Sequence, residues 1–452
     1  MMKKEEKMQL NEVKNGKNRF YAKQTGITLI ALVITIVVLL ILAGVSINAL
    51  FSDNGIIERA KNAQNKVDEA EKKDLEEINK LNNWLEENGT IKSETTPIAP
   101  TKDTAPYYPD TTFTKVEGTD LDNGLVIKDA KGNEYVWIEV PKSLYTNNDY
   151  NTQTTTADQK PEKSTDYDKI EYCLHKYTDY YRNGTSNSDI YYSDETTGLT
   201  SEQYVKLKQK MLKSVYENGG FWIGRYEAGI TENRTTSGTP TIAPISKQGT
   251  DENPVYPYNY LTCSQAQTLA NMLTTENYTS SLMFGVQWDL VLKHIETKEV
   301  SKGTTLATIQ SALRTDSKDW GNYKDTSFII NRGKYAKYGV LGTWYNYNNE
   351  NGLANCVTYA NGTSTKVSNT DYNNSILLTT GASDDCKKMN IYDLAGNVWE
   401  WTLEYTANTD YPCAHRGGSY YDTCSDCPVS IRYDGTTAYS YDTLGLRISL
   451  FK

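Results

Sequence analysis

The sequence has little histidine, little phenylalanine and too few basic residues to balance its acids. Its three histidines, His175, His294 and His415, are too few and too scattered to indicate an acid/base catalytic site, so we expect them to be structural or solvated. The net charge of −10 argues against nucleic acid as a partner. Phenylalanine occurs 7 times and tyrosine 35 times. Tyrosine combines apolar area with a hydroxyl group and is common on recognition surfaces, although extracellular bacterial domains are often rich in it for other reasons.

Charge is absent from one long segment near the N-terminus. No charged residue occurs from Gln24 to Ser52, and Ile27 to Leu50 is apolar enough and long enough to cross a bilayer as one helix. Residues 1–26 carry seven Lys or Arg and three Glu, a net charge of +4. This basic leader, with Asp53 after the apolar run, predicts a cytoplasmic N-terminus and an extracellular remainder. An ordinary signal peptide has a shorter apolar core and is excluded.

The start of the apolar run, Gly26-Ile27-Thr28-Leu29-Ile30, resembles a type IV prepilin cleavage site. The resemblance implies cleavage after Gly26, methylation of Ile27 by a prepilin peptidase, and other pilins as partners. Pilins usually carry Glu at the fifth mature position, where this chain has Ala31. The resemblance therefore implies a filament tip or a plain anchor in the membrane. An uncleaved single-pass anchor is the alternative.

Two further segments separate this anchor from the bulk of the chain. Residues 51–89 carry an apolar stripe at three- and four-residue steps on a charged background, which predicts a stalk helix or a short coiled coil. Residues 90–114 are rich in Thr, Lys and Pro, which predicts a semi-extended linker. The main domain boundary is placed here.

Residues 115–452 are expected to form one outer domain of the α+β class. Residues 125–127 and 135–138 predict a β-hairpin, and residues 142–200 predict a long surface insertion. Helices are predicted over 202–218, from Thr262 to 273, and over 286–295. Residues 346–374 are mostly polar and predict a loop.

The stretch from Ile391 to Trp401 places turn-forming residues before Trp399-Glu400-Trp401. Alternation along a strand puts the two tryptophans on one face and the carboxylate on the other. Carboxylate and carbonyl oxygens that converge at such a turn would suit a hard cation such as calcium. A turn that simply enters a buried strand is the plainer interpretation.

Several motifs together resemble the formylglycine-generating enzyme, or sulfatase-modifying factor, superfamily. They are Phe221-Trp222-Ile223-Gly224-Arg225-Tyr226-Glu227, residues 392–401, Arg416-Gly417-Gly418-Ser419-Tyr420 and Gly445-Leu446-Arg447. The resemblance spans about 220–452 and implies a loop-rich variant of the C-type lectin fold. It also implies a structural Ca²⁺ ion held by the side chains of Asp393 and Glu400 and the carbonyls of Gly396 and Val398.

The enzymes of that family bind copper through two cysteines after the Gly-Gly-Ser motif. Here Cys427 occupies the second position, but Asp422 stands in the first and Cys424 is displaced by two residues. A two-residue shift moves a thiol by about 6 to 7 Å in an extended segment, so the copper site is broken. A disulfide among Cys413, Cys424 and Cys427 is the preferred interpretation, and a zinc site that adds His415 is the alternative.

Two functions follow from these patterns. The first is a pilin-like, membrane-anchored surface protein that displays a non-catalytic lectin-like domain for an extracellular protein or glycan. The resemblance places its ligand face within residues 420–441 and just beyond. The candidate ligand-binding residues are Tyr421, Asp422, Tyr433, Asp434, Tyr439, Tyr441 and Asp442. The second is an extracytoplasmic copper oxidase that converts a sulfatase cysteine to formylglycine with Cys424 and Cys427.

Overall fold

The computed structural model of the chain describes residues 106–452, except 153–157 and 183–187. The predicted leader 1–26, membrane helix 27–50 and stalk 51–89, and most of the linker 90–114, lie outside these residues. The described residues belong to one unit, Pro97–Lys452. Within them, no helix combines the length and the apolar character that a membrane crossing requires.

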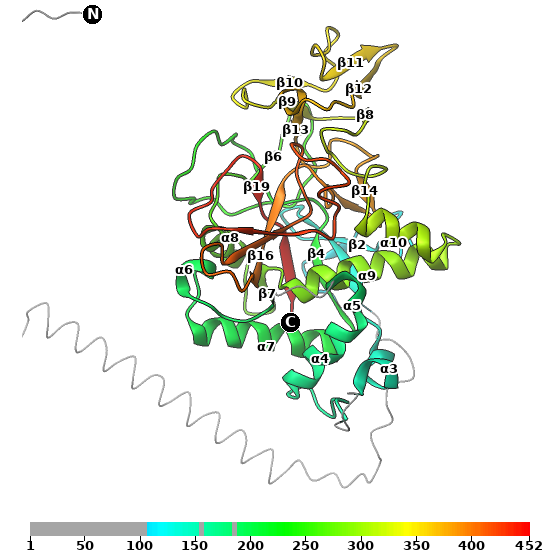
Figure 1. The fold of residues 1–452 in the computed structure, drawn as a ribbon, viewed down its shortest axis with the longest axis vertical. Coiled ribbons are helices and arrows are strands. Elements are labelled where there is room, and N and C mark those ends of the chain that lie inside the picture. Colours follow the sequence, from blue (N-terminus) through cyan, green and yellow to red (C-terminus); the bar gives the residue numbers. More distant parts are fainter. Residues whose placement is uncertain (1–105, 153–157, 183–187) are drawn as a thin grey trace, which may run out of the picture. The chain divides into compact units, whose positions relative to one another are not determined.

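A six-stranded antiparallel sheet runs through the middle of this unit, with strand order β1-β2-β3-β4-β20-β7 (Figure 1). The strands are β1 (Thr114–Lys115), β2 (Val126–Lys128), β3 (Glu134–Glu139), β4 (Gly220–Gly224), β7 (Thr279–Leu282) and β20 (Ile448–Phe451). The predicted hairpin is confirmed as β2 paired with β3. Strand β20 pairs with both β4 and β7, so the last strand lies in the interior of the sheet.

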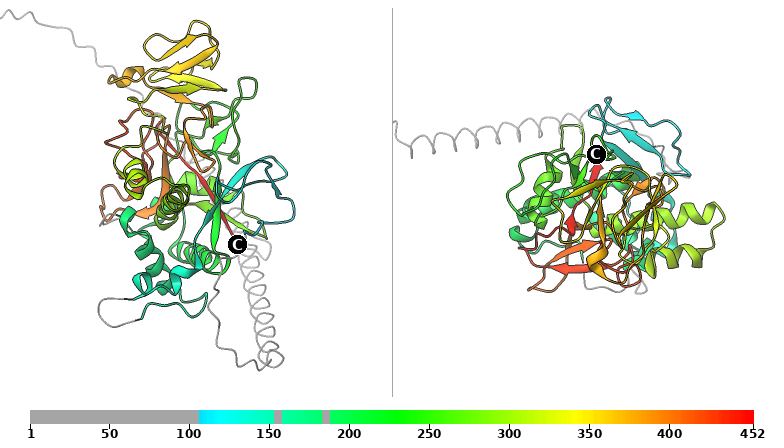
Figure 2. Two further views of the ribbon diagram at one scale, coloured as in Figure 1. Left: turned by 90° about the vertical axis from the view of Figure 1, so that its right-hand side faces the viewer. Right: turned by 90° about the horizontal axis from the view of Figure 1, so that it is seen from above.

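A four-stranded sheet, β18-β17-β16-β19, carries the tryptophan motif. Its strands are β16 (Trp399–Tyr405), β17 (Cys413–Arg416), β18 (Arg432–Gly435) and β19 (Leu444–Gly445). Figure 2 shows β1 to β3 and this sheet on opposite sides of the unit. Both faces of β16 are covered, and Glu400 is only 1% exposed. The predicted polar side of this strand is therefore buried too.

Four small sheets complete the strand framework. Two have three strands: β10 (Trp344–Asn346), β9 (Lys334–Lys337) and β13 (Ile376–Leu378), and β11 (Val357–Ala360), β12 (Thr363–Lys366) and β8 (Phe328–Ile330). Two have two strands: β5 (Gly229–Ile230) with β6 (Tyr256–Pro257), and β14 (Lys387–Lys388) with β15 (Ile391–Tyr392). The prediction of loop over 346–374 was wrong in part, because β11 and β12 form a hairpin there.

Three of the longer helices were predicted from local signals. They are α7 (Ser201–Asn218), α8 (Cys263–Asn271) and α9 (Gly285–Ser301). A capping box satisfies free backbone N–H groups at the start of α8, through Thr262 and Gln265, as predicted. Helix α9 continues six residues beyond its predicted end at Ile295. Helix α10 (Leu306–Arg314) was not predicted.

The predicted insertion over 142–200 contains short helices. They are η1 (Lys142–Tyr145), α3 (Asn148–Asn151), α4 (Tyr167–Tyr177), α5 (Asp179–Arg182) and α6 (Asp194–Thr197); the remaining short helix, η2 (Tyr372–Asn374), lies elsewhere. Ile170, Cys173 and Leu174 of α4 are fully buried. Their three- and four-residue spacing places them on one helical face. This segment therefore contributes to the core.

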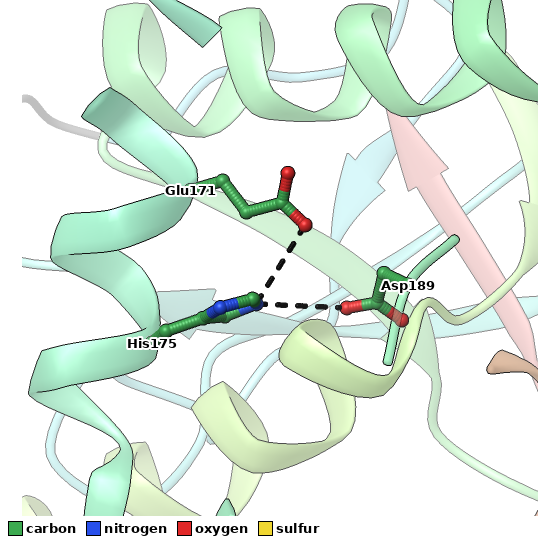
Figure 3. Close-up of side chains that lie close together, drawn as sticks. All are labelled: Glu171, His175 and Asp189. Carbon is green, nitrogen blue, oxygen red and sulfur yellow. Dashed lines mark ion pairs between the residues drawn. The ribbon is translucent and has the colours of Figure 1, made fainter. Parts of the chain in front are cut away.

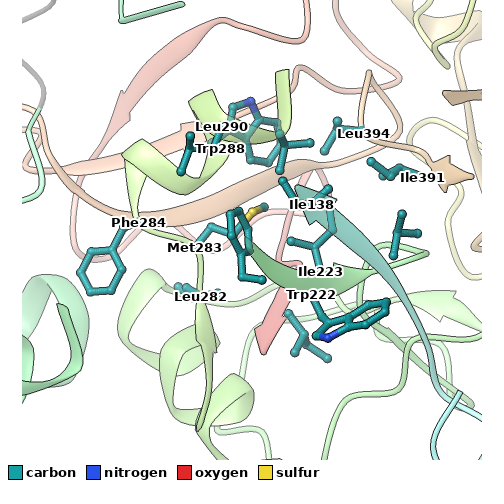
Figure 4. Close-up of a cluster of buried hydrophobic side chains, with 14 of the residues drawn as sticks. Ile138, Trp222, Ile223, Leu282, Met283, Phe284, Trp288, Leu290, Ile391 and Leu394 are labelled. Atoms are coloured by element: carbon teal, nitrogen blue, oxygen red, sulfur yellow. The ribbon is translucent and has the colours of Figure 1, made fainter. Parts of the chain in front are cut away.

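Helix α9 packs its apolar side against the sheets. Figure 4 shows Trp288 and Leu290 of α9 near Ile138 and Ile223, which come from β3 and β4. All four side chains are at most 1% exposed. The core is therefore built between α9 and strands that are far apart in the sequence, and it holds the C-terminal loops in place.

Candidate functional site

A cavity of about 340 Å³ opens beside the C-terminal loops. It is lined by Thr235, Tyr260, Tyr338, Gly339, Val340, Leu341, Gly342 and Asp442. Only Asp442 belongs to the predicted ligand set. The other lining residues come from two earlier segments, 235–260 and 338–342, which no sequence motif marked.

Two further tyrosine rings pack against Tyr338, which lines this cavity. The ring of Tyr338 lies 5.2 Å from that of Tyr421 and 5.5 Å from that of Tyr372, centroid to centroid. Tyr372 and Tyr421 are 5.1 Å apart. We call Tyr338, Tyr372 and Tyr421 the tyrosine cluster. Such tilted and edge-on pairs fix the rings mutually. Tyr338 is the member of the cluster that lines the cavity, and the other two rings hold it in place.

Asp442 and Tyr260 form the other side of the cavity. The hydroxyl of Tyr420 donates to Asp442 Oδ2 at 2.5 Å, and this carboxylate raises the pKa of Tyr420 after the larger effect of burial. Tyr260 has φ of 55°, and its N–H donates to the carbonyl of Tyr441 at 2.9 Å. A left-handed conformation is costly for a tyrosine and is often found at functional sites. The carboxylate and the Tyr260 backbone are thus held by specific bonds.

Four other predicted ligand residues lie on β18 and in the segment that follows it. Tyr433 is 56% exposed and packs on Trp399 at 5.8 Å, and Tyr441 is 52% exposed and packs on Tyr439 at 5.2 Å. Asp434 accepts a hydrogen bond from Asn408 at 3.4 Å. Asp434 and Tyr439 are half-buried. None of these four residues lines the cavity.

Asp422 is engaged internally. Its Oδ2 accepts the Ser419 N–H at 2.9 Å and the Ser419 hydroxyl at 2.7 Å. Burial raises its pKa. The residue that replaces the first copper-binding cysteine therefore closes the turn after Gly417-Gly418 and is not free for ligand.

The cysteines do not form the predicted disulfide. All seven cysteines are free thiols, and all lie within the described residues. Cys424 Sγ donates to Asp325 Oδ2 at 3.2 Å. Cys413 instead neighbours Cys263, and their mutual hydrogen bond is the largest cause that raises the pKa of Cys263. The partner of Cys413 was missed because Cys263 is 150 residues earlier in the chain.

The copper and zinc alternatives also lack support from the geometry. Burial raises the pKa of Cys424 and of Cys427, and nearby carboxylates raise both further. Metals bind the thiolate, which a raised pKa disfavours. His415 lies between Trp399 and Trp401, and burial lowers its pKa to about 3. Among the described residues, Cys413, His415, Cys424 and Cys427 do not gather at metal-binding distances.

The predicted calcium turn is formed, but one of its ligands is already paired. Arg447 donates from Nε to both oxygens of Glu400 at 3.0 Å and from Nη2 to Oε1 at 2.7 Å. Gly396 has φ of 72°, and its N–H donates to the carbonyl of Gly417. Val398 is 1% exposed. The Glu400 carboxylate does not fit as a calcium ligand while Arg447 holds it.

Asp393 fits a cation better, and sequence reasoning missed a second such carboxylate, Glu227. Both side chains are fully buried, and Asp393 Oδ1 and Glu227 Oε2 have no hydrogen-bond partner among the described residues. Burial raises the pKa of Asp393 to about 7. Burial, and then the charge of Asp393, raises the pKa of Glu227. Asn397 donates to Glu227 Oε1 and so ties it to the turn.

A separate cluster joins the insertion to α9 (Figure 3). His175 Nε2 lies 3.7 Å from Glu171 Oε1 and 3.9 Å from Asp189 Oδ2. Asp189 also accepts the N–H groups of Gly285 and Val286 at the start of α9, at 2.6 and 2.9 Å. Lys208 Nζ lies 2.9 Å from Glu171 Oε2. Lys208 pairs with Glu171, and the N–H groups of α9 hold Asp189, so the geometry of this cluster serves to dock α4.

The comparisons with known proteins concern the C-terminal part of the chain. Residues 334–450 match the family described as "Sulfatase-modifying factor enzyme 1-like domain". Two solved structures are similar: "Crystal Structure of CarF", with 13% identity and a TM-score of 0.28, and "Treponema denticola variable protein 1", with 15% identity and a TM-score of 0.24. Each covers 52% of this chain, and 87% and 85% of their own chains respectively. No curated protein matches the chain.

Proposed function

We propose that the outer domain is a non-catalytic, lectin-like module that binds an extracellular glycan, displayed at the cell surface on a pilin-like membrane anchor. The cavity beside Tyr338 carries this proposal. Tyr260 and Tyr338 offer aromatic surface for the C–H face of a sugar ring, and Asp442 offers a carboxylate for its hydroxyl groups. A volume of about 340 Å³ lies at the lower end of the range of small-molecule sites.

Three tyrosines on β18 and in the segment after it support a larger binding face. Tyr433 lies on β18, and Tyr439 and Tyr441 lie in the segment that follows it. Tyr433 and Tyr441 are exposed, and Tyr439 is half-buried beside Tyr441. Tyrosine loses little side-chain entropy on binding, so such surfaces bind with small ordering costs. In this proposal the cavity takes one sugar residue, and the outer tyrosines contact its neighbours.

The test is a glycan-array screen with the labelled full-length chain in mild detergent. We expect binding to a limited set of glycans, with at least a tenfold loss for Tyr338→Ala. Tyr192→Ala is the matched control, because Tyr192 also packs against another tyrosine, Tyr405, but does not line the cavity. Glycan binding that survives Tyr338→Ala, or binding to matrix proteins alone, would contradict the proposed site.

The anchor rests on the charge-free segment from Gln24 to Ser52 and the junction at Gly26. We expect the mature N-terminus to be methylated Ile27 in cells that contain a prepilin peptidase. Mass spectrometry of the N-terminal peptide measures this directly, and Gly26→Val should leave the chain uncleaved. An unmodified N-terminus at Met1 would instead support a plain single-pass anchor.

A structural calcium ion is the proposed cofactor. The unpartnered oxygens of Asp393 and Glu227 support a revised ligand set in which Glu227 takes the place of Glu400. Carbonyl groups of the turn, those of Gly396 and Val398, remain candidates for the other ligands. The ion would neutralise two buried carboxylates and so stabilise the turn before β16.

The alternative function, a copper-dependent oxidase, makes an opposite prediction. It requires copper binding at Cys424 and Cys427 and oxygen uptake with a cysteine-containing sulfatase peptide. The raised pKa of both thiols favours neither copper binding nor oxygen uptake. Copper-dependent uptake that is lost in Cys424→Ser and Cys427→Ser variants would replace the binding proposal.

A further inference from the structure

A second cavity, of about 190 Å³, lies where α5, the end of α10 and the segment 428–432 meet. Arg182, Arg314 and Arg432 line it, together with Tyr181, Ser430 and Ile431. The charged lining is entirely basic, although the chain as a whole has a net charge of −10. Such local excess of positive charge needs an explanation.

The deep wall of this cavity is fixed by buried ion pairs. Asp289 Oδ2 accepts from Arg182 Nη1 at 3.2 Å and also from Arg432 Nη2. Arg432 Nε donates to Glu404 Oε1 at 3.0 Å. The side chains of Asp289 and Glu404 are fully buried, and that of Arg432 is 6% exposed. The positions of these guanidinium groups are therefore set before any ligand arrives.

A third arginine, Arg416, pairs with the same two carboxylates, those of Asp289 and Glu404. Arg416 donates from Nη2 to Asp289 Oδ1 at 2.9 Å and from Nη1 to Glu404 Oε2 at 3.2 Å. Three guanidinium groups thus share Asp289 and Glu404. Asp189 supplies a third negative charge close enough to raise the pKa of Arg432, although burial, which lowers it, is the largest influence. The charges of this network are balanced without Arg314.

Arg314 adds a positive charge that the network does not neutralise. It is the last residue of α10, and its guanidinium carbon lies 4.5 Å from the ring centroid of Tyr180. Within the described residues its guanidinium group forms no ion pair and no hydrogen bond. The stacking holds the guanidinium plane at the cavity while its N–H groups stay available.

We propose that this cavity binds a phosphate or sulfate group, either as the free ion or at the end of an ester. Arginines that approach from α5, α10 and β18 surround the space from several directions, which suits a tetrahedral oxyanion better than a flat carboxylate. The volume admits such a group but is smaller than the roughly 300 Å³ of a typical small-molecule site. The site is independent of the glycan cavity beside Tyr338.

The test is isothermal titration of the full-length chain, in mild detergent at low ionic strength, with sodium phosphate, sodium sulfate, glucose 6-phosphate and sodium acetate. We expect millimolar or tighter binding of phosphate and sulfate, with acetate at least tenfold weaker. Glucose 6-phosphate distinguishes a site that admits an ester, where it binds as well as phosphate, from one that takes only the free ion.

Arg314→Gln should weaken phosphate binding at least tenfold, and Arg314→Lys should weaken it less. Lys318→Gln is the charge-matched control. It also removes one positive charge, four residues along the chain from Arg314, and the Lys318 side chain is 62% exposed. If Arg314→Gln is unstable, a phosphate-dependent rise in the melting temperature of the wild-type chain, absent with acetate, gives an independent measurement. No binding by the wild-type chain, or equal binding by Arg314→Gln, would show that Arg314 only balances the C-terminal dipole of α10.

Discussion

Arg447 and Glu400 form a fully buried ion pair in which one guanidinium group contacts both carboxylate oxygens at 3.0 Å or less. Arg447 also donates to the carbonyls of Gly224 and Tyr392 at 2.9 and 2.8 Å. One side chain therefore joins β4, β15 and β16. Its removal should affect the whole framework that carries the candidate binding face.

Replacing Arg447 by Met leaves the Glu400 carboxylate buried without a partner. We expect the free energy of unfolding to fall by about 3 to 5 kcal/mol, as for other broken buried pairs. Urea unfolding measures this. Lys213→Met, which removes an exposed pair with Glu217, should change it by less than about 1 kcal/mol. The double variant with Glu400→Gln should recover part of the loss; no recovery would mean that the carboxylate is not the source of the cost.

The raised pKa of Asp393 predicts that the effect of calcium on stability depends on pH. Its pKa rises from the ordinary 3.8 to about 7 because it is buried. Between these values the folded state keeps a proton that the unfolded state has lost, so this group lowers stability as pH rises towards 7. In the presence of a chelator, we expect the melting temperature of the wild-type chain, relative to that of Asp393→Asn, to fall from pH 5 to pH 8. Calcium should restore the melting temperature of the wild-type chain at pH 8 but not at pH 5.

The control for this experiment is Asp410→Asn, which alters an exposed aspartate. It should show the same calcium response as the wild-type chain. An equal response in Asp393→Asn would place any calcium elsewhere.

The lowered pKa of His415 predicts that stability changes with pH in the opposite direction. Burial lowers its pKa from 6.5 to about 3, so below pH 6.5 the unfolded state binds a proton that the folded state does not. The contribution of His415 to the free energy of unfolding therefore falls by up to about 1.4 kcal/mol for each unit that the pH is lowered between 6.5 and 3. His415→Gln should therefore lose less stability than the wild-type chain between pH 6.5 and 4.5. An equal loss of stability in the wild-type chain and in His415→Gln between the two pH values would contradict a buried neutral histidine.

Cys263 and Cys413 are the expected pair if the domain is oxidised. Their thiols are hydrogen-bonded and both residues are at most 2% exposed. During refolding with oxidised glutathione, the two thiols should lose two protons and two electrons to form a disulfide, with reduced glutathione as the other product. Non-reducing peptide mapping detects the link, which Cys263→Ser should abolish and Cys424→Ser should not. A peptide that joins two of Cys413, Cys424 and Cys427 instead would restore the disulfide expected from sequence.

The parts of the fold that the sequence predicted are those set by local signals. The α8 capping box, the β2–β3 hairpin and the helical pattern of α7 each depend on residues within one short segment. The pairing of Arg447 with Glu400 was not predicted, although both motifs were identified. Forty-seven residues separate them, and neither motif states that they meet.

The candidate site was predicted only in part for the same reason. Asp442 and Tyr421 were found because they lie in the C-terminal loops. Tyr260, Tyr338 and Glu227 were missed because tertiary packing, and no local pattern, brings them there. The spacing of Cys424 and Cys427 was visible, but the direction of the Cys424 thiol, towards Asp325, depends on the fold.

The interior place of β20 has a consequence for how the chain is made. Residues 448–451 fill the gap between β4 and β7, and β4 precedes them by more than two hundred positions. Until a ribosome has delivered that stretch, β4 and β7 lack the strand that joins them, so the six-stranded sheet is among the last parts of the fold to be completed.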